Sequence, residues 1–279
     1  MVSDRCGAGH QGSGGSARPA AESAHVGREL TGWALDLDGV IWRGSETVPG
    51  APAAVARLRA AGVPIAFVTN SAQRTPAQVA DKLASHGIPD AESEVITAAV
   101  AATTMVDPGD RILAIGSDGV FEALRARGCT VVHDGPADAV IMGITQAFDY
   151  DMMTRAMHAI VDGARFIATN TDSTFPMADR LVPGNGALVA AVATATGLEP
   201  EIAGKPHNPI AALVRAQLGP SGLMVGDRAD TDGLFASVVG YDFALVLSGV
   251  TTEADLPTDP PAMHTAPDLA VLVDQLLED

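Results

Sequence analysis

The chain alternates between short apolar runs and longer stretches with apolar residues at helical spacing. A short apolar run that stops at a polar turn predicts a buried strand, and apolar residues at intervals of three and four predict a helix. The predicted strands are 33–35, 65–68, 111–115, 130–132, 139–142, 166–168, 223–225 and 244–247. The predicted helices are 51–61, 75–87, 118–127, 150–162 and 186–196.

Strands that alternate with helices predict an α/β fold, because such strands form parallel sheets joined by right-handed crossovers. The composition agrees, since 47% of the residues are hydrophobic and only 4% are aromatic. Aliphatic strands and Ala-rich helices suit this class better than an all-β sandwich. The strands are too many for one compact sheet, so we expect two domains.

The formal net charge of −17 argues against a nucleic-acid polymer as a partner, because phosphate backbones repel an acidic surface. A small phosphorylated substrate stays open, since one local cation can reverse the field where the substrate binds. No apolar run reaches the ~20 residues that a membrane helix needs, so we expect no membrane partner.

Two further features bear on the location of the protein. Residues 1–28 are rich in Gly, Ser and Ala and lack the apolar centre of a secretory signal, which predicts a disordered leader. Cys6 and Cys129 lie in no Cys-x-x-Cys or Cys/His cluster, so we expect neither a disulfide framework nor a zinc site. This cysteine pattern fits the reducing cytoplasm.

Polar side chains gather directly after apolar segments, where ligands bind in an open parallel sheet. The four groups are Asp36 with Asp38, Thr69 with Asn70, Lys205 in Gly-Lys-Pro, and Asp227 with Asp232. Taken singly, each group has a structural explanation: a turn, a helix cap, a loop or a structural cation site. Their chain order and their positions at strand ends instead predict one shared crevice.

The expected crevice predicts its own cofactor. Carboxylates at such short range repel one another unless a cation neutralises them. Ligands that are all oxygen, with no His or Cys, favour a hard ion, and phosphate chemistry favours Mg²⁺ over Ca²⁺.

Electrostatics suggests a role for each group. A carboxylate can attack phosphorus only where the negative charge of the substrate is masked, and Mg²⁺ and the ammonium of Lys205 would mask it. The hydroxyl of Thr69 would bind a phosphoryl oxygen. Asp36 would attack and form an aspartyl-phosphate. Asp38 would give a proton to the leaving oxygen and then activate water.

With these residues the sequence resembles the haloacid dehalogenase superfamily, whose four motifs match the four groups in order. The long interval between Thr69 and Lys205 is similar to subfamily IIA, which carries an α/β cap of the C2 type at that point. The resemblance implies a Rossmann-like core and an inserted cap. The predicted domains are a core of 29–105 with 200–279 and a cap of 106–199. Three further segments, 163–170, 183–186 and 247–251, also look like this subfamily.

The resemblance also implies further roles. Asp36, the backbone carbonyl of Asp38 and Asp227 look like the magnesium ligands, and Asp232 looks like the residue that supports the metal shell. Asn70 and Arg74 lie in the phosphate-binding loop of the family. Two positions depart from the usual pattern: Ser71 stands where many members have a second Asn, and Gly233 stands where an aliphatic residue is usual.

The substrate is less constrained than the reaction. Asn170 and Asp172 belong to a polar cap loop that we expect to face the site, although an ordinary solvated turn would also explain it. Such a loop suits a hydroxylated leaving group, so we expect glycerol phosphate, a nucleoside monophosphate, phosphoglycolate or a sugar phosphate. Similar proteins form homodimers through their caps, which makes a homodimer the expected assembly.

Other functions were weighed against the phosphatase. A dehalogenase on this scaffold does not need Asp38, but a phosphotransferase, a phosphomutase or a catalytically silent metabolite-binding regulator stays open. Pro206 follows Lys205 where a nucleotide-binding P-loop has Ser or Thr. No Gly-x-Gly-x-x-Gly follows the first strand, which disfavours a dinucleotide enzyme.

Overall fold

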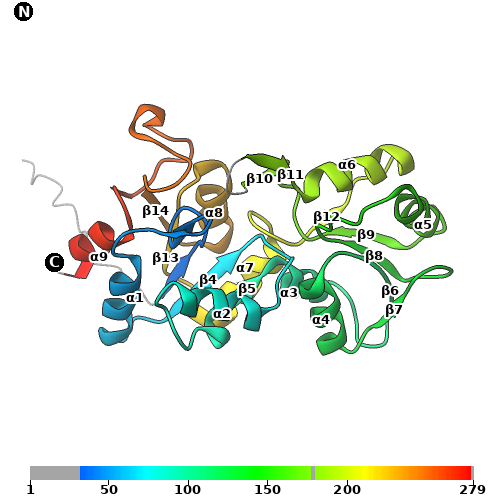
Figure 1. The fold of residues 1–279 in the computed structure, drawn as a ribbon, viewed down its shortest axis with the longest axis horizontal. Helices are drawn as coiled ribbons and strands as arrows, with labels where there is room; N and C mark the ends of the chain where they lie inside the picture. Colours follow the sequence, from blue (N-terminus) through cyan, green and yellow to red (C-terminus); the bar gives the residue numbers. More distant parts are fainter. Residues whose placement is uncertain (1–31, 177–179, 278–279) are drawn as a thin grey trace, which may run out of the picture.

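Two parallel sheets with helices on their faces make up most of the protein (Figure 1). The computed structural model describes residues 32–176 and 180–277, so the predicted leader 1–28 lies outside the described residues. The sheets confirm the α/β class predicted from the sequence.

The first sheet has six strands in the order β15-β14-β13-β1-β4-β5, and every neighbouring pair is parallel. The strands are β1 (Trp33–Leu35), β4 (Ile65–Thr69), β5 (Val95–Thr97), β13 (Leu223–Gly226), β14 (Asp242–Val246) and β15 (His264–Ala266). The chain continues from β1 to β4 on one side, and it returns to β13 on the other. Ligands bind beyond the carboxyl ends of strands at such a switch in strand order.

Helices cover both faces of this sheet. One face packs against α1 (Ala51–Ala60), α2 (Pro76–Ser85) and α9 (Leu269–Leu277). The other packs against α3 (Ala98–Thr103), α7 (Asn208–Leu218) and α8 (Leu234–Val239). In β1, Trp33 and Leu35 join the first layer and Ala34 joins the second, as the two-residue period of a strand requires.

The second sheet has five parallel strands in the order β12-β9-β8-β6-β7. The strands are β6 (Arg111–Ile115), β7 (Thr130–Val132), β8 (Ala139–Met142), β9 (Arg165–Ala168) and β12 (Glu201–Ile202). One face packs against α5 (Tyr150–Val161) and α6 (Asn185–Thr196). The other packs against α4 (Asp118–Arg127), in a hydrophobic cluster that continues into the first sheet.

The remaining described elements are short. They are the antiparallel pairs β2 (Trp42–Arg43) with β3 (Glu46–Thr47) and β10 (Thr174–Pro176) with β11 (Leu181–Pro183), the 3-10 turns Glu92–Glu94 and Glu253–Asp255, and the π-helical turn Ala229–Gly233. Among the helices of residues 32–176 and 180–277, none combines the length and the apolar character needed to cross a membrane.

Every strand and helix predicted from the sequence is present, with limits that agree within two residues. The second sheet lies between β5 and β13 in the chain, and β12 returns to it just before Lys205. The limits proposed for the two domains stay predictions.

Candidate active site

The site lies where β1, β4 and β13 end. Asp36 follows β1, and its backbone N–H donates to the carbonyl of Val225 at 2.9 Å. Thr69 is the last residue of β4, and Asp227 follows β13 directly. Three groups that are far apart in the sequence therefore meet at one edge of the first sheet.

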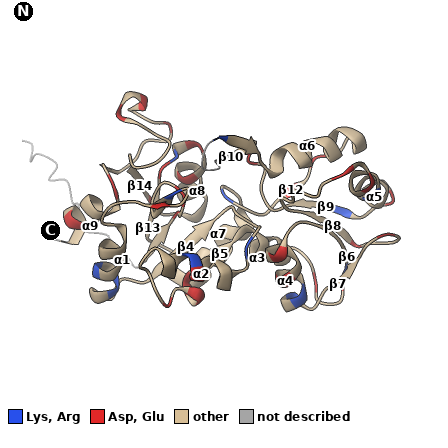
Figure 2. Ribbon diagram, in the orientation of Figure 1, with Lys and Arg blue, Asp and Glu red and all other residues tan. Residues whose placement is uncertain are grey.

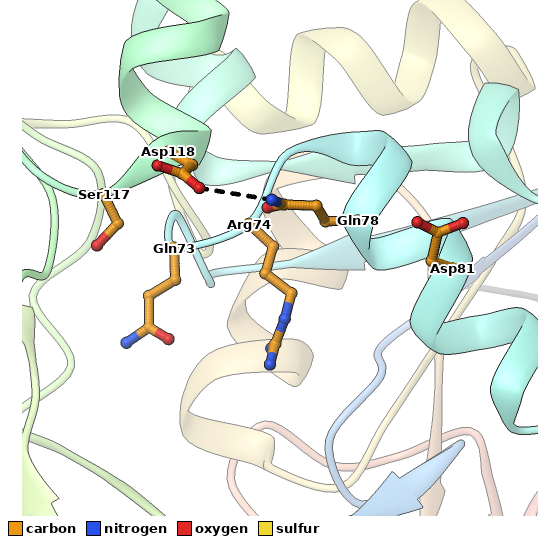
Figure 3. A pocket seen from close by; sticks show the side chains of 6 residues that line it. All are labelled: Gln73, Arg74, Gln78, Asp81, Ser117 and Asp118. Carbon is orange, nitrogen blue, oxygen red and sulfur yellow. Dashed lines mark hydrogen bonds between the residues drawn. The ribbon is translucent and has the colours of Figure 1, made fainter.

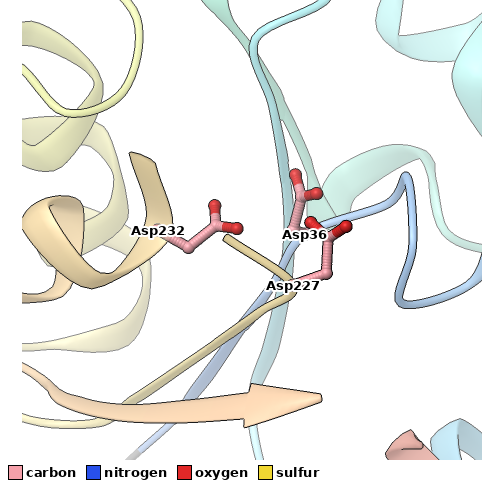
Figure 4. Close-up of side chains that lie close together, drawn as sticks. All are labelled: Asp36, Asp227 and Asp232. Carbon is pink, nitrogen blue, oxygen red and sulfur yellow. The ribbon is translucent and has the colours of Figure 1, made fainter. Parts of the chain in front are cut away.

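Asp36, Asp227 and Asp232 form a carboxylate triplet (Figure 4). One oxygen from each lies within 4.8 Å of the others. Asp227 and Asp232 are buried, at 3% and 1% exposure. Close, buried carboxylates need a nearby cation, because their mutual repulsion is weakly screened away from water.

Lys205 supplies one such cation. Its Nζ donates to Oδ1 of Asp36 at 2.6 Å and to Oδ1 of Asp232 at 2.7 Å, and its side chain is 3% exposed. Burial lowers the pKa of Lys205, but Asp232 and Asp36 outweigh burial and raise it above its usual value. The ammonium therefore stays charged between the two carboxylates.

One ammonium does not neutralise the triplet. Burial raises the pKa of Asp36 well above its usual value; Lys205 opposes the rise, and Asp232 and Asp227 add to it. Burial and the charge of Asp232 likewise raise the pKa of Asp227 to about 6, although the backbone N–H of Val250 donates to its Oδ2 at 2.6 Å.

Hydrogen bonds divide the triplet into two kinds of carboxylate. Both oxygens of Asp232 are engaged, Oδ1 by Lys205 and Oδ2 by the backbone N–H of Arg228 at 3.2 Å. Asp36 and Asp227 each keep one oxygen without a donor from the described residues. This oxygen-only set fits a hard divalent cation, which Asp36 and Asp227 could bind through their remaining oxygens while Asp232 is held by other donors.

Two glycines make room for Asp227. A Cβ on Gly39 or on Gly249 would overlap the Asp227 carboxylate, and Gly39 also has a left-handed φ of 82°. Neither position accepts a larger residue without moving this carboxylate. Gly39 is further tied to the site because its carbonyl accepts a hydrogen bond from Ser248 Oγ at 2.6 Å.

Asn70 connects Lys205 to the second sheet. Its Oδ1 accepts from the backbone N–H of Lys205 at 2.7 Å, and its Nδ2 donates to the carbonyl of Lys205 at 3.1 Å. The same Nδ2 lies 3.4 Å from both carboxylate oxygens of Asp172. Asn170 Nδ2 donates to the carbonyl of Asn70 at 2.7 Å. The predicted cap loop thus reaches the core beside the triplet.

Asn185 fixes this cap loop, a role that the sequence did not predict although segment 183–186 resembles the subfamily. It is 1% exposed, and its Nδ2 donates to the carbonyls of Asn170 at 2.8 Å and Met142 at 3.1 Å. It follows Gly184 at the start of α6.

Thr69 and Arg74 differ in their exposure and in their surroundings. Thr69 is buried, and its Oγ1 accepts from the backbone N–H of Ser71 at 3.1 Å, which leaves its own proton free to donate. Arg74 is exposed and lines a neighbouring pocket of about 530 Å³ with residues of α2 and of the start of α4 (Figure 3). The structure does not bring Arg74 into contact with the carboxylate triplet.

Asp38 is exposed; burial raises the pKa of Asp36, and the negative charge of Asp38 adds to that rise. Its Oδ1 accepts a hydrogen bond from Nε1 of the buried Trp42 at 2.9 Å. Sequence reasoning missed Trp42, because a tryptophan after an Asp-x-Asp-Gly turn is read as core.

An acidic cluster at the switch point of a parallel α/β core, with a second α/β sheet beside that core, defines a class of two-part α/β proteins. Comparison with known proteins identifies the class. A family model described as haloacid dehalogenase-like hydrolase matches residues 33–130, and a related hydrolase model matches residues 202–272. The chain belongs to the haloacid dehalogenase superfamily, subfamily IIA, as the sequence motifs predicted.

The relatives are phosphatases. A 5'-nucleotidase of Bacillus subtilis is 37% identical over 82% of this chain and 91% of its own length. An acid sugar phosphatase of Staphylococcus epidermidis is 33% identical over 87% of this chain and 96% of its own. A glycerol phosphate phosphatase of Mycobacterium tuberculosis, solved in complex with magnesium, superposes with a TM-score of 0.82 at 32% identity, over 88% of this chain and 76% of its own. The chain is a phosphoric monoester hydrolase of this family.

Proposed function

We propose that the chain is a Mg²⁺-dependent phosphatase that hydrolyses a small phosphomonoester through an aspartyl-phosphate on Asp36. The observation that best supports this proposal is the hydrogen bond from Lys205 Nζ to Asp36 inside the carboxylate triplet. An ammonium at this place holds the nucleophile and attracts the anionic substrate to it.

In the first step, a carboxylate oxygen of Asp36 attacks phosphorus and the ester oxygen leaves. Lys205 and the hydroxyl of Thr69 bind phosphoryl oxygens, and Asp38 gives a proton to the leaving oxygen. In the second step, water attacks phosphorus, Asp38 takes a proton from it, and the bond to Asp36 breaks. Inorganic phosphate and free Asp36 result.

Asp36, the backbone carbonyl of Asp38 and Asp227 would hold the Mg²⁺, with Asp232 behind them. When bound, the ion would mask the negative charge of the substrate that otherwise repels a carboxylate nucleophile. The donor set supports this assignment, because two oxygens of the triplet lack a protein donor among the described residues and the charge on Asp227 is otherwise disfavoured.

The substrate we propose has a hydroxylated leaving group, with glycerol phosphate and nucleoside monophosphates as the first candidates and sugar phosphates and phosphoglycolate next. Support comes from the polar cap loop at Asn170 and Asp172, which reaches the site through Asn70. The relatives named above act on a nucleotide, a sugar phosphate and glycerol phosphate.

Phosphate release from p-nitrophenyl phosphate and from a panel of phosphometabolites, with Mg²⁺ and with EDTA, tests the proposal. We expect turnover only with the metal and none from Asp36→Asn. Full turnover by that variant, or by the wild type in EDTA, would contradict the mechanism. Release from no phosphomonoester at all would favour the silent regulator.

A further inference from the structure

We infer that Trp42 is a positioning residue for the general acid Asp38: its indole N–H holds Oδ1 of Asp38 and so leaves Oδ2 to carry the catalytic proton. The inference rests on the proposed function. It begins from the hydrogen bond of 2.9 Å between Trp42 Nε1 and Asp38 Oδ1. No other donor to the Asp38 carboxylate is present among the described residues.

The backbone brings these two residues together as well. The Gly39 N–H donates to the carbonyl of Trp42 at 2.7 Å, and Asp38 and Trp42 form an isolated parallel bridge. The turn after Asp38 therefore folds back on itself, and Trp42 begins the short hairpin β2–β3. A Trp at this position meets Asp38 without depending on a distant part of the chain.

The indole ring is fixed in place by α2. Trp42 is 3% exposed, the ring of His86 stacks on it with centroids 5.0 Å apart, and Lys82 Nζ lies 3.7 Å from its ring centroid. Lys82 and His86 are four residues apart, so they point to the same side of the helix. His86 is held in turn, because its Nδ1 lies 2.7 Å from Oγ1 of Thr47 in the hairpin.

Lys82 also contributes charge. The sequence contains two lysines, Lys82 and Lys205, and Lys82 makes no ion pair shorter than 4.0 Å with any described residue. Burial lowers the pKa of Lys82, the charge of Asp38 raises it, and Arg74 lowers it. The ammonium over the indole is therefore close enough to Asp38 to attract it.

The donor chemistry of the indole determines which oxygen of Asp38 is available to carry the proton. An indole N–H donates and cannot accept, and in a protonated carboxyl group the carbonyl oxygen is a better acceptor than the hydroxyl oxygen. The contact with Oδ1 therefore favours the proton of Asp38 on Oδ2. In the first step that proton passes from Oδ2 to the ester oxygen while the bond from Asp36 to phosphorus forms and the ester bond breaks. A carboxyl group free to rotate would present the wrong oxygen part of the time.

Leaving groups that differ in their need for a proton test this role. p-Nitrophenolate departs without a proton, whereas the alkoxide of an alkyl phosphate such as glycerol phosphate requires one. For Trp42→Phe, which keeps a ring beside Lys82 and His86 but removes the donor, we expect kcat/KM for the alkyl phosphate to fall about tenfold more than kcat/KM for p-nitrophenyl phosphate. Equal losses for both substrates would overturn the inference.

Two further variants guard against a merely structural effect. Trp33→Phe makes the same change at the other tryptophan of the chain, which is buried in β1 and makes no side-chain hydrogen bond with the described residues, so it should change both substrates alike. Lys82→Met, on the partly exposed side of α2, should fold in any case and lower the alkyl-to-aryl ratio about two- to threefold. An unchanged ratio in Trp42→Phe would overturn the inference whatever Lys82→Met shows, while the absence of wild-type turnover would overturn the proposed function instead.

Discussion

At the scale of the residue, the site holds three carboxylates and one ammonium at short range. Lys205 lies between Asp36 and Asp232, both of which are largely buried, and no second ammonium or guanidinium among the described residues contacts the triplet. Removing one partner from a buried ion pair costs more than the pair contributes, because the remaining charge stays desolvated. Lys205 is therefore expected to matter for folding as well as for binding phosphate.

Lys205→Met should lower kcat/KM by about 10²–10³-fold and the free energy of unfolding in EDTA by about 3–5 kcal/mol. Mg²⁺ should restore part of that stability, because a second cation enters the triplet. Arg125→Met, which removes an exposed cation from α4, is the matched control and should leave both quantities nearly unchanged. Thermal and urea unfolding with phosphate release provide the measurement, and a variant as stable and active as the wild type would refute the electrostatic argument.

The raised pKa of Asp227 predicts a pH dependence. Its folded-state pKa is about 6, above the usual value of about 3.9 for an unfolded Asp. Stability from this group is fully present below about pH 4 and is lost as pH rises through about 6, by about 2–3 kcal/mol in EDTA.

Urea unfolding between pH 4 and 7 measures this loss. Asp227→Asn should remove much of it, and saturating Mg²⁺ should reverse it above pH 6, because the ion binds the charged form. Asp230→Asn is the control: Arg228 hydrogen-bonds Asp230 and lowers its pKa, so this variant should keep the wild-type slope over the same range. A wild-type slope in Asp227→Asn would show that other groups cause the effect.

At the scale of the element, close backbone contacts join the two sheets beside the site. The N–H of Gly119, in the first turn of α4, donates to the carbonyl of Gln73 at 3.1 Å. A Cβ at position 119 would lie 2.5 Å from the carbonyl oxygen of Arg74 and 2.6 Å from that of Ala72. The loop after β4 therefore depends on α4 for its position.

Gly119→Ala should displace this loop, lower the free energy of unfolding by about 1–3 kcal/mol and reduce kcat/KM. Gly197→Ala, at a helix end where a Cβ would meet no other atom, should cost only the strain of its φ of 70° and leave kcat/KM unchanged. Unfolding curves and kinetics of the two variants make the comparison. Equal effects on kcat/KM would show that the contact of α4 with the loop is dispensable.

The sequence predicted the strands and helices with strong periodicity and missed others for physical reasons. The helix α3 is Ala98–Thr103, whose Ala-rich sequence has no polar face to show a period, and α8 is only Leu234–Val239. Strand β15 and helix α9 follow segment 247–251, the last one that resembles the subfamily, and the sequence predicted no element after it. Gly233, where an aliphatic residue is usual, ends a π-helical turn that runs into α8.

Contacts between distant segments explain what the sequence did not predict in the site. The sequence predicted the candidate catalytic groups because each follows an apolar run, which is a local signal. Asn185 lies in a segment that resembles the subfamily, but its hydrogen bonds to Met142 and Asn170 form only when the chain folds. Trp42 is four residues from Asp38, but a buried tryptophan after a turn is typical of a core, so the sequence did not predict its hydrogen bond. Arg74 was placed in the phosphate loop, yet its side chain lines the neighbouring pocket.

At the scale of the whole molecule, two parallel sheets share a continuous hydrophobic cluster, and hydrogen bonds between Asn70 and the loop of Asn170 and Asp172 join the two halves. Acidic residues are spread over both halves (Figure 2), so under the proposed function the cation beside the triplet, rather than the net charge of −17, would determine where an anionic substrate binds. The homodimer and the cytoplasmic location stay predictions; light scattering after gel filtration measures the first.

The hydrogen bonds of Asn70 with Asp172 and Asn170 predict that the cap loop acts on substrate binding and not on the chemical step. Asp172→Ala removes a cap carboxylate that lies 3.4 Å from Asn70 Nδ2, without touching the triplet. We expect KM for the preferred phosphometabolite to rise about tenfold while kcat for p-nitrophenyl phosphate, which offers the cap no hydroxyl groups, changes by less than about twofold. Asp151→Ala, an exposed carboxylate of α5, is the control. Equal changes for both substrates would argue against recognition of the leaving group by the cap loop.

The central claim is that Asp36 is the residue that takes the phosphoryl group. Mixing the protein with substrate and Mg²⁺, quenching in acid and locating the phosphate by mass spectrometry of peptides tests it most directly. The account predicts a phosphate on Asp36 that forms only with Mg²⁺ and is absent from Asp36→Asn. Phosphate on another residue, or steady turnover with none on the protein at any time, would contradict it.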